Sequence, residues 1–209
     1  MDGNKNITAS FAINTYTITA TTDGNGTINP PGVSSVNYGE NKTYTFAPNT
    51  GYHFVDLFVD DVHQDSTSSY TFINVTGDHM IKAKFGINTY KIAASASTGG
   101  LIKPAGSTVV NYGESQAYTF LPESGYHFVD LFVDNIHSDS TTSYTFTNVS
   151  TNHTIEARYA LNQFTIVATA GAHGTITPEG AVTVDSGSNQ SFAITADEGY
   201  YIADIHVDT

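Results

Sequence analysis

Histidine and aspartate recur at fixed spacing along this chain, and both residue types are common ligands of divalent metals. In "DDVHQD" (60–65), the alternation of a β-strand would place Asp61, His63 and Asp65 on one face. Three pairs of histidines are 74 residues apart: His53 and His127, His63 and His137, and His79 and His153. The second copy has Asn135 in place of Asp61, and histidines on half-exposed strands are often simply surface residues. Surface histidines are therefore favoured over a transition-metal site.

Calcium is a second metal that the chain could bind, because it prefers oxygen donors and the chain has 20 acidic residues against 7 basic ones. The candidate ligands are five aspartates in the repeated segments: Asp56, Asp60, Asp61, Asp130 and Asp134. However, residues four apart on a strand are separated by about 13 Å. The chain also has no D-x-D-x-D-G loop. We therefore expect no cofactor, with calcium at these aspartates as the open alternative.

Catalytic and nucleic-acid-binding motifs are missing from the sequence. It contains no G-x-S-x-G, H-E-x-x-H or P-loop motif, and it has no cysteine for thiol catalysis or disulfides. The net charge of −13, without a basic stripe, argues against binding to phosphates of nucleic acids. No segment is apolar enough to span a membrane. The sequence thus predicts a protein that is not an enzyme.

The clearest feature of the chain is internal repetition. The stretch "GYHFVDLFVD" occurs unchanged at 51–60 and 125–134, and a related stretch, "GYYIADIHVD", occupies 199–208. Alignment at an offset of 74 residues gives roughly 42 identities in 74 positions between the first two copies. The predicted domains are the closing strand of a preceding repeat (1–12), repeat 1 (13–86), repeat 2 (87–160) and an incomplete repeat 3 (161–209).

Alternation of apolar and polar residues predicts β-strands throughout. "YTITAT" (16–21), "TYTF" (43–46) and "MIKAKF" (80–85) each place apolar residues on one face. Turn residues follow every 8–12 residues or so, and no segment has a sustained helical period. The sequence therefore predicts an all-β fold of β-grasp-like or small β-sandwich modules, arranged end to end.

The ten-residue stretch itself is predicted to be a core strand that ends in a turn at 60–61 or 134–135. One face carries Val55, Leu57 and Val59, which are expected in the core, as are Ala203, Ile205 and Val207 in the third copy. The other face carries Asp56, Phe58 and Asp60, with Asp204, His206 and Asp208 in the third copy. Because an aromatic residue alternates with histidine there, this face is expected to meet solvent. Phe58, Phe132 and His206 form the predicted interaction surface, unless a loop or strand covers them.

The order of these motifs resembles the divergent form of the internalin B repeat. The resemblance rests on the Gly–Tyr pairs at 51–52, 125–126 and 199–200, on "SYTF-x-NV" (69–75 and 143–149), and on the closing "H-x-I-x-A" strand. One departure is Asp61 or Asn135 after "VD", where such repeats usually have glycine. The resemblance implies a small β-rich module, used as a spacer or adhesive element in secreted and cell-surface proteins, and it implies no catalytic residues.

These observations predict an extracellular or cell-surface structural repeat, a semi-rigid stalk, spacer or filament segment. We expect any signal peptide or anchor to lie outside this fragment. Self-assembly is one further expectation, because "NITASFA" (6–12) resembles the closing strand "MIKAKFG" (80–86) and could complete repeat 3 of another copy. The alternative is an adhesin or carbohydrate-binding module whose partners are surface glycans or other surface proteins.

Overall fold

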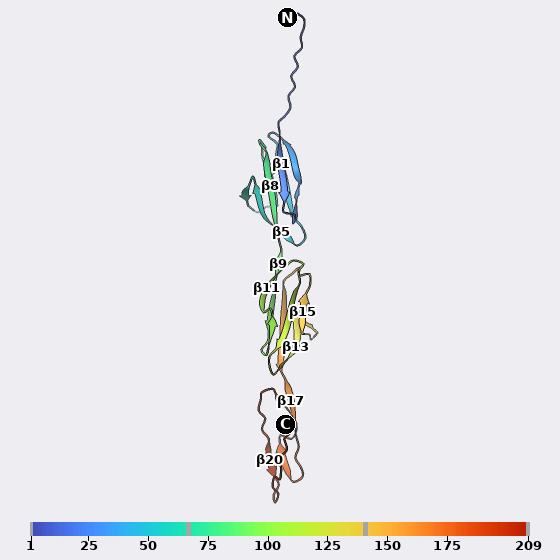
Figure 1. Cartoon of the computed structure of the whole chain (residues 1–209), viewed down its shortest axis with the longest axis vertical. Coiled ribbons are helices and arrows are strands. Elements are labelled where there is room, and N and C mark those ends of the chain that lie inside the picture. The colour runs from blue at the N-terminus through green and yellow to red at the C-terminus, as the bar shows by residue number, and fades with distance from the viewer. Residues whose placement is uncertain (1, 66–67, 140–141, 208–209) are drawn as a thin grey trace. The chain divides into compact units, whose positions relative to one another are not determined.

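The computed structural model describes residues 2–65, 68–139 and 142–207, which form β-strands and no helix (Figure 1). None of these residues belongs to a helix that could cross a membrane. The prediction of an all-β fold is thus confirmed. The chain divides into two compact units, which are described separately below. The first contains the residues up to Tyr90 with 111–114 and 148–150, and the second contains the rest.

Each of the first two repeats supplies the same series of strands. Those of repeat 1 are β1 (Thr15–Thr22), β2 (Gly26–Asn29), β3 (Gly32–Asn37), β4 (Lys42–Pro48), β5 (Tyr52–Val59), β6 (Val62–Gln64), β7 (Ser69–Phe72) and β8 (His79–Ile87). Those of repeat 2 are β9 (Thr89–Ala96), β10 (Gly100–Lys103), β11 (Gly106–Asn111), β12 (Gln116–Pro122), β13 (Tyr126–Val133), β14 (Ile136–Ser138), β15 (Ser143–Phe146) and β16 (His153–Leu161). Repeat 3 contributes β17 (Gln163–Ala168), β18 (Gly174–Thr177), β19 (Gly180–Asp185) and β20 (Ala193–Ala196).

Two sheets make up each complete repeat. In repeat 1 a five-stranded sheet with the order β3-β1-β8-β5-β6 packs on a three-stranded sheet with the order β2-β4-β7. Repeat 2 has the same two sheets, β11-β9-β16-β13-β14 and β10-β12-β15. Neighbouring strands are mostly antiparallel, but β1 pairs with β8, and β9 with β16, in parallel. The arrangement is that of a small sandwich.

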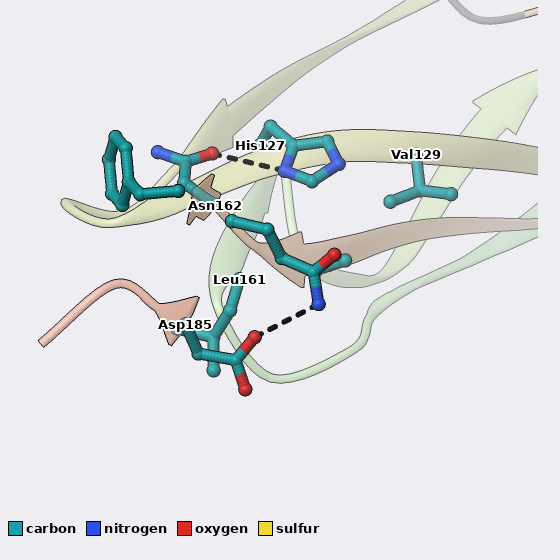
Figure 2. Close-up of a pocket in the computed structure, with 8 residues that line it drawn as sticks. His127, Val129, Leu161, Asn162 and Asp185 are labelled. Atoms are coloured by element: carbon teal, nitrogen blue, oxygen red, sulfur yellow. Dashed lines mark hydrogen bonds between the residues drawn. The ribbon is translucent and has the colours of Figure 1, made fainter. Parts of the chain in front are cut away.

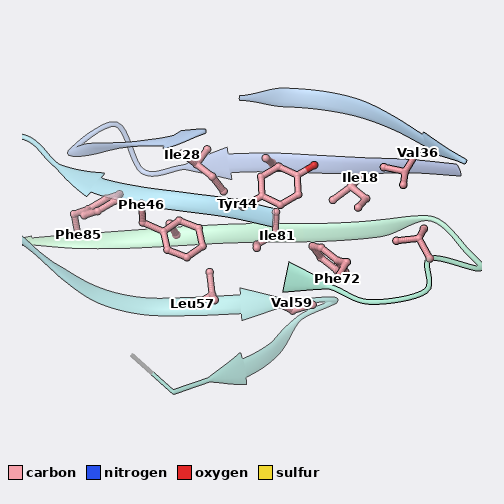
Figure 3. Close-up of a cluster of buried hydrophobic side chains, with 13 residues drawn as sticks. Ile18, Ile28, Val36, Tyr44, Phe46, Leu57, Val59, Phe72, Ile81 and Phe85 are labelled. Carbon is pink, nitrogen blue, oxygen red and sulfur yellow. The ribbon is translucent and has the colours of Figure 1, made fainter. Parts of the chain in front are cut away.

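The alternating apolar residues form the core between these sheets (Figure 3). Ile18 of β1, Tyr44 of β4 and Ile81 of β8 are all 0% exposed. Their strand neighbours point the other way and are more exposed, as the period of two requires. The faces predicted for 16–21, 43–46 and 80–85 are therefore the faces observed.

The prediction for the ten-residue stretch is only partly correct. Leu57 and Val59 are buried, but Val55 is 43% exposed. The pairing of β5 with β8 shifts register between Phe54 and Asp56, which marks a β-bulge. A bulge adds one residue to one strand, so it reverses the alternation, and Phe54 packs on the core in place of Val55.

The predicted turn after this strand is confirmed. Asp60 and Asp61 have φ angles of 51° and 63°, and Asp134 and Asn135 have the same values. These left-handed conformations are ones that Asp and Asn tolerate better than most residues. Asp61 and Asn135 therefore replace the usual glycine at little conformational cost.

The core prediction for the third copy of the stretch is wrong. Its described residues, 199–207, form no strand, and Ala203, Ile205 and Val207 are exposed. Asp208 lies outside the described residues. In the first two repeats this strand pairs with β8 or β16, and no counterpart of those strands is present among the described residues of repeat 3. Within the described residues, the segment therefore has no equivalent strand to pair with.

Two buried hydroxyls lead to a mutational prediction. The Oη atoms of Tyr44 and Tyr118 are buried, and neither has a hydrogen-bond partner among the described residues. An unsatisfied buried hydroxyl costs about 1–3 kcal/mol. Tyr44→Phe is therefore expected to raise the free energy of unfolding of repeat 1 by up to about that amount, as measured by urea denaturation. Tyr118→Phe should do the same in repeat 2, and a loss of stability in both would contradict the assignment.

Candidate functional site

A single asparagine connects repeats 2 and 3 and is hydrogen-bonded to both. β16 of repeat 2 ends at Leu161, one residue beyond the predicted end of that repeat, and β17 of repeat 3 begins at Gln163. Asn162 is therefore the only residue between the strands of the two repeats. Its N–H donates to the carbonyl of Gly125, and its own carbonyl accepts from the N–H of Ser186, each at 2.8 Å. Its Oδ1 lies 3.0 Å from Nδ1 of His127. We call Gly125, His127, Asn162 and Ser186 the joint.

The Gly–Tyr marker of the sequence has a physical role in the joint. Gly125 has a φ of +84°, which L side chains rarely adopt. A Cβ added there would lie 2.9 Å from Oγ of Ser186. Glycine thus both makes the turn and allows the backbone of repeat 2 to approach repeat 3 closely.

Unit 1 contains the same arrangement around Asn88, which lies between β8 and β9. The N–H of Asn88 donates to the carbonyl of Gly51 at 2.8 Å. Its Oδ1 lies 2.9 Å from Nδ1 of His53. The recurring His53 and His127 are therefore explained by contact with the linker asparagine, a role that the sequence did not indicate.

An open pocket of about 860 Å³ lies beside the joint (Figure 2). His127, Val129 and Leu161 line it together with Asn162 and Asp185. Its polar side chains are already paired: His127 contacts Asn162, and Nε2 of Gln163 donates to Oδ1 of Asp185 at 3.0 Å. The arrangement is suited to holding two repeats together and contains no nucleophile placed beside a base.

The other recurring histidines contact the predicted aspartates. Nε2 of His63 lies 2.7 Å from Oδ1 of Asp56, and Nδ1 of His79 lies 2.7 Å from Oδ2 of Asp60. Repeat 2 has equivalent contacts, also at 2.7 Å, in the pairs His137–Asp130 and His153–Asp134. Burial raises the pKa of Asp60, but hydrogen bonds from the Met80 N–H and from His79 outweigh it and leave the pKa below its usual value.

The structure does not gather the predicted metal ligands into one cluster. Within residues 2–65, 68–139 and 142–207, no three His, Asp or Glu side chains converge as a metal site would require. His63 contacts Asp56 rather than joining Asp61 and Asp65. Any calcium ion at Asp56 or Asp60 would compete with a histidine, and calcium binding at these residues stays a prediction.

The predicted interaction surface is partly covered by the sheet's own side chains. Phe58 is half-buried, with Nζ of Lys84 4.7 Å from its ring centroid and His63 at its edge. Cζ of Arg158 lies 4.1 Å from the ring of Phe132. His206 is exposed and contacts Asp204 at 2.9 Å. A partner would therefore meet an aromatic ring combined with a cation rather than a bare apolar patch.

Sequence reasoning missed four side chains that hydrogen-bond to the backbone at the ends of the parallel strand pairs. In repeat 1, Oδ1 of Asp78 accepts from the Thr17 N–H at 2.7 Å, and Oδ2 of Asp23 accepts from the Phe85 N–H at 2.9 Å. We call these side chains the brackets. The repeat 2 brackets are Asn152, which accepts from the Lys91 N–H at 2.8 Å, and Ser97, which accepts from the Tyr159 N–H at 2.9 Å.

The brackets predict that acid lowers the stability of repeat 1 more than that of repeat 2. Hydrogen bonds from the N–H and hydroxyl of Thr17 lower the pKa of Asp78. Burial raises the pKa of Asp23, but hydrogen bonds from the Phe85 and Asn25 N–H groups outweigh it, with a smaller contribution from Lys82. A lowered pKa in the folded state means that the stabilisation is present above pH 3.8 and is lost as the pH falls through the folded-state value.

Asn152 and Ser97 do not titrate, so repeat 1 should lose more stability than repeat 2 below about pH 4. Asp60 in repeat 1 and Asp134 in repeat 2 both have a lowered pKa, so this pair shifts stability in the same direction in both repeats. Amide hydrogen exchange resolved by residue, at pH 3 and pH 6, measures the two repeats in one sample. Equal losses in both repeats would show that Asp23 and Asp78 contribute nothing.

A family model described as "Divergent InlB B-repeat domain" matches the chain three times, at residues 16–89, 90–163 and 164–206. Each match begins three residues after the start expected for its repeat at 13, 87 or 161. No curated protein and no solved structure matches the chain in the corresponding comparisons. Since the three matched segments cover most of the sequence, the chain belongs to the divergent InlB B-repeat family.

Proposed function

We propose that this chain is a non-catalytic structural segment of an extracellular or cell-surface protein, in which tandem repeats form a semi-rigid spacer. Membership in a family of surface-protein repeats, which are typically non-catalytic, supports the location and the general role. The finer claim, that the repeats act as a spacer, rests on the joint.

One observation carries this proposal: the linker between repeats 2 and 3 is a single residue whose backbone N–H, backbone carbonyl and side chain are all hydrogen-bonded. In a flexible linker these groups would be hydrogen-bonded to water instead of to the protein. Asn162 instead receives a partner from each side, and Asn88 makes all three equivalent contacts in unit 1, with its carbonyl accepting from the Tyr112 N–H at 2.8 Å. Motion at the linker must therefore break specific bonds.

Backbone ¹⁵N relaxation tests this directly on the whole chain. The amides of Asn88 and Asn162 are expected to have order parameters of about 0.85, equal to those of the strands beside them. His127→Ala should lower the value at Asn162 and leave Asn88 as the internal control. Values below about 0.6 at both asparagines in the unaltered protein would contradict the spacer.

Carbohydrate binding is the second candidate, and a groove in repeat 2 favours it. The groove has a volume of about 440 Å³, and its lining combines small residues, such as Ala93 and Ser95, with Phe132 and Glu156. A lining of small residues together with an aromatic ring suits the apolar face of a sugar. In repeat 1, Lys82 stands in the position of Glu156, so the two repeats should differ.

Glycan-array binding with Phe132→Ala tests this second candidate. Loss of a bound glycan in Phe132→Ala, with binding retained in Phe58→Ala, would support a site in repeat 2. The absence of any bound glycan on a broad array would remove this candidate.

Self-association by strand complementation is a further proposal. Ile166 of β17 is 41% exposed, whereas its counterparts Ile18 and Ile92 are 0% exposed in strands that pair with β8 and β16. Residues 6–12 are exposed and have the apolar pattern of those closing strands. Light scattering over a range of concentrations should show a mass that rises if this segment pairs with β17 of another copy, and a constant mass would exclude it.

A further inference from the structure

The first and last strands of each complete repeat lie side by side and run in the same direction. In repeat 1, β1 and β8 pair from Ile18 opposite His79 to Thr22 opposite Ala83. In repeat 2, β9 and β16 pair from Ile92 opposite His153 to Ala96 opposite Ala157. The chain therefore enters a repeat at the start of one strand and leaves it at the end of its parallel neighbour.

This topology determines how tension acts on the repeat. A pull on the two ends draws β1 and β8 in opposite directions along their own length. All the hydrogen bonds between them are then loaded together, because the bonds of a parallel pair are evenly spaced along the strands. A pull on the same end of both strands would instead break the bonds one after another.

The parallel pair is also protected from water on its inner face. Ile18, Ile81 and Ala83 are 0% exposed, so sliding one strand past the other would disturb the packed core. β8 is held on its other edge by β5, along a register from Tyr52 opposite Ile87 to Val59 opposite Ile81. Strand sliding is thus opposed by two ladders and by apolar packing.

The brackets extend the parallel pair at both ends. Asp78 precedes β8 and accepts from Thr17, whereas Asp23 follows β1 and accepts from Phe85. In repeat 2 different side chains, Asn152 and Ser97, accept from the equivalent N–H groups. The residue types change between repeats while the hydrogen bonds from the backbone N–H groups stay the same, which indicates that these backbone bonds matter more than the charge.

We infer that each complete repeat is a shear clamp, which resists tension along the chain through its parallel first and last strands and the two brackets that flank them. The inference deepens the proposed spacer, because a spacer held at both ends is loaded in this direction. β17 has no parallel partner among the described residues, so repeat 3 as described lacks the clamp. Rupture of one clamp should release roughly 250 Å of chain, since a repeat has about 70 residues at 3.3–3.6 Å each.

Single-molecule force spectroscopy on the full chain tests the clamp, and the absence of cysteine makes introduced cysteines unique handles. Handles at Ile13→Cys and Thr89→Cys load β1 and β8 in shear. Handles at Ile13→Cys and Gly77→Cys pull on the same end of both strands. Ile13 and Thr89 are exposed, and a Cβ at Gly77 meets no atom within 4 Å.

The shear pair should rupture at a force several-fold higher than the peeling pair, because peeling breaks one bond at a time. Equal forces would overturn the inference. In shear, Asp78→Ala should raise the rupture rate at fixed force roughly tenfold, by removing hydrogen bonds to a charged group. Asp78→Asn should keep the rupture rate near that of the unaltered protein, since Asn152 accepts the equivalent hydrogen bond in repeat 2.

An unchanged rupture rate in Asp78→Ala would show that the brackets do not contribute to the resistance of the repeat to tension. Circular dichroism of each variant establishes that it is folded before it is pulled. The relaxation experiment on Asn162 reports on the joint and not on the strands. The spacer proposal and the clamp inference can therefore be refuted independently of each other.

Discussion

Ile81→Ala is expected to lower the free energy of unfolding of repeat 1 by about 2–5 kcal/mol, the range measured for such truncations in cores. Ile81 is 0% exposed and lies between the two sheets with Ile18, Tyr44 and Leu57 (Figure 3). Domains of this size have only a small margin of stability. The variant should therefore unfold repeat 1 at urea concentrations where repeat 2 stays folded.

Urea denaturation followed by NMR peaks of each repeat measures this effect. Met80→Ala is the matched control, because Met80 is the preceding residue of β8 but is 46% exposed. It should change stability by no more than about 0.5 kcal/mol. If both variants cost the same, the assignment of the β8 faces is wrong.

Gly100→Ala is expected to destabilise repeat 2 by about 1–3 kcal/mol, the usual cost of overpacking a core. An added Cβ would overlap the ring of Tyr159, which is 8% exposed. That ring cannot move away easily, because its hydroxyl donates to the carbonyl of Leu101 at 2.7 Å. Thermal unfolding by calorimetry, with repeats distinguished by NMR, gives the size of the loss.

Two further glycines provide comparisons. Gly26→Ala would meet the ring of Phe85 in repeat 1, but Phe85 has no hydroxyl to anchor it, so a smaller loss is expected. Gly171→Ala meets no atom within 4 Å and should be close to neutral. A larger loss in Gly26→Ala than in Gly100→Ala would show that the Tyr159 hydrogen bond does not hold the ring in place.

The sequence allowed the strands and most of the core to be predicted, because period-two alternation is a local property. It could not place Val55, since the bulge that exposes this residue depends on pairing with β8, a strand distant in sequence. The parallel pairing of β1 with β8 was equally inaccessible, because alternation gives faces and not neighbours. The turn residues indicated where strands end, but the order of the strands in a sheet could not be read from them.

The candidate site was harder to predict than the fold. His53 and His127 were noticed because they recur, but their partners Asn88 and Asn162 lie 35 residues further along the chain. The asparagines themselves recur in "INTY" and "LNQF", which is the signal that could have identified the joint. The brackets gave no such signal, since Asp78 becomes Asn152 and Asp23 becomes Ser97. Only the shared hydrogen bond relates them.

The measurement that most directly tests the spacer is a distance distribution between repeats 2 and 3 in solution. Spin labels at Ser107→Cys and Glu179→Cys occupy exposed positions within unit 2, and the chain has no other cysteine. Double electron–electron resonance should give one narrow distribution, which broadens when Asn162→Gly removes the side-chain contact with His127. A broad distribution in the unaltered joint, unchanged by Asn162→Gly, would mean that the repeats move freely and would contradict the spacer.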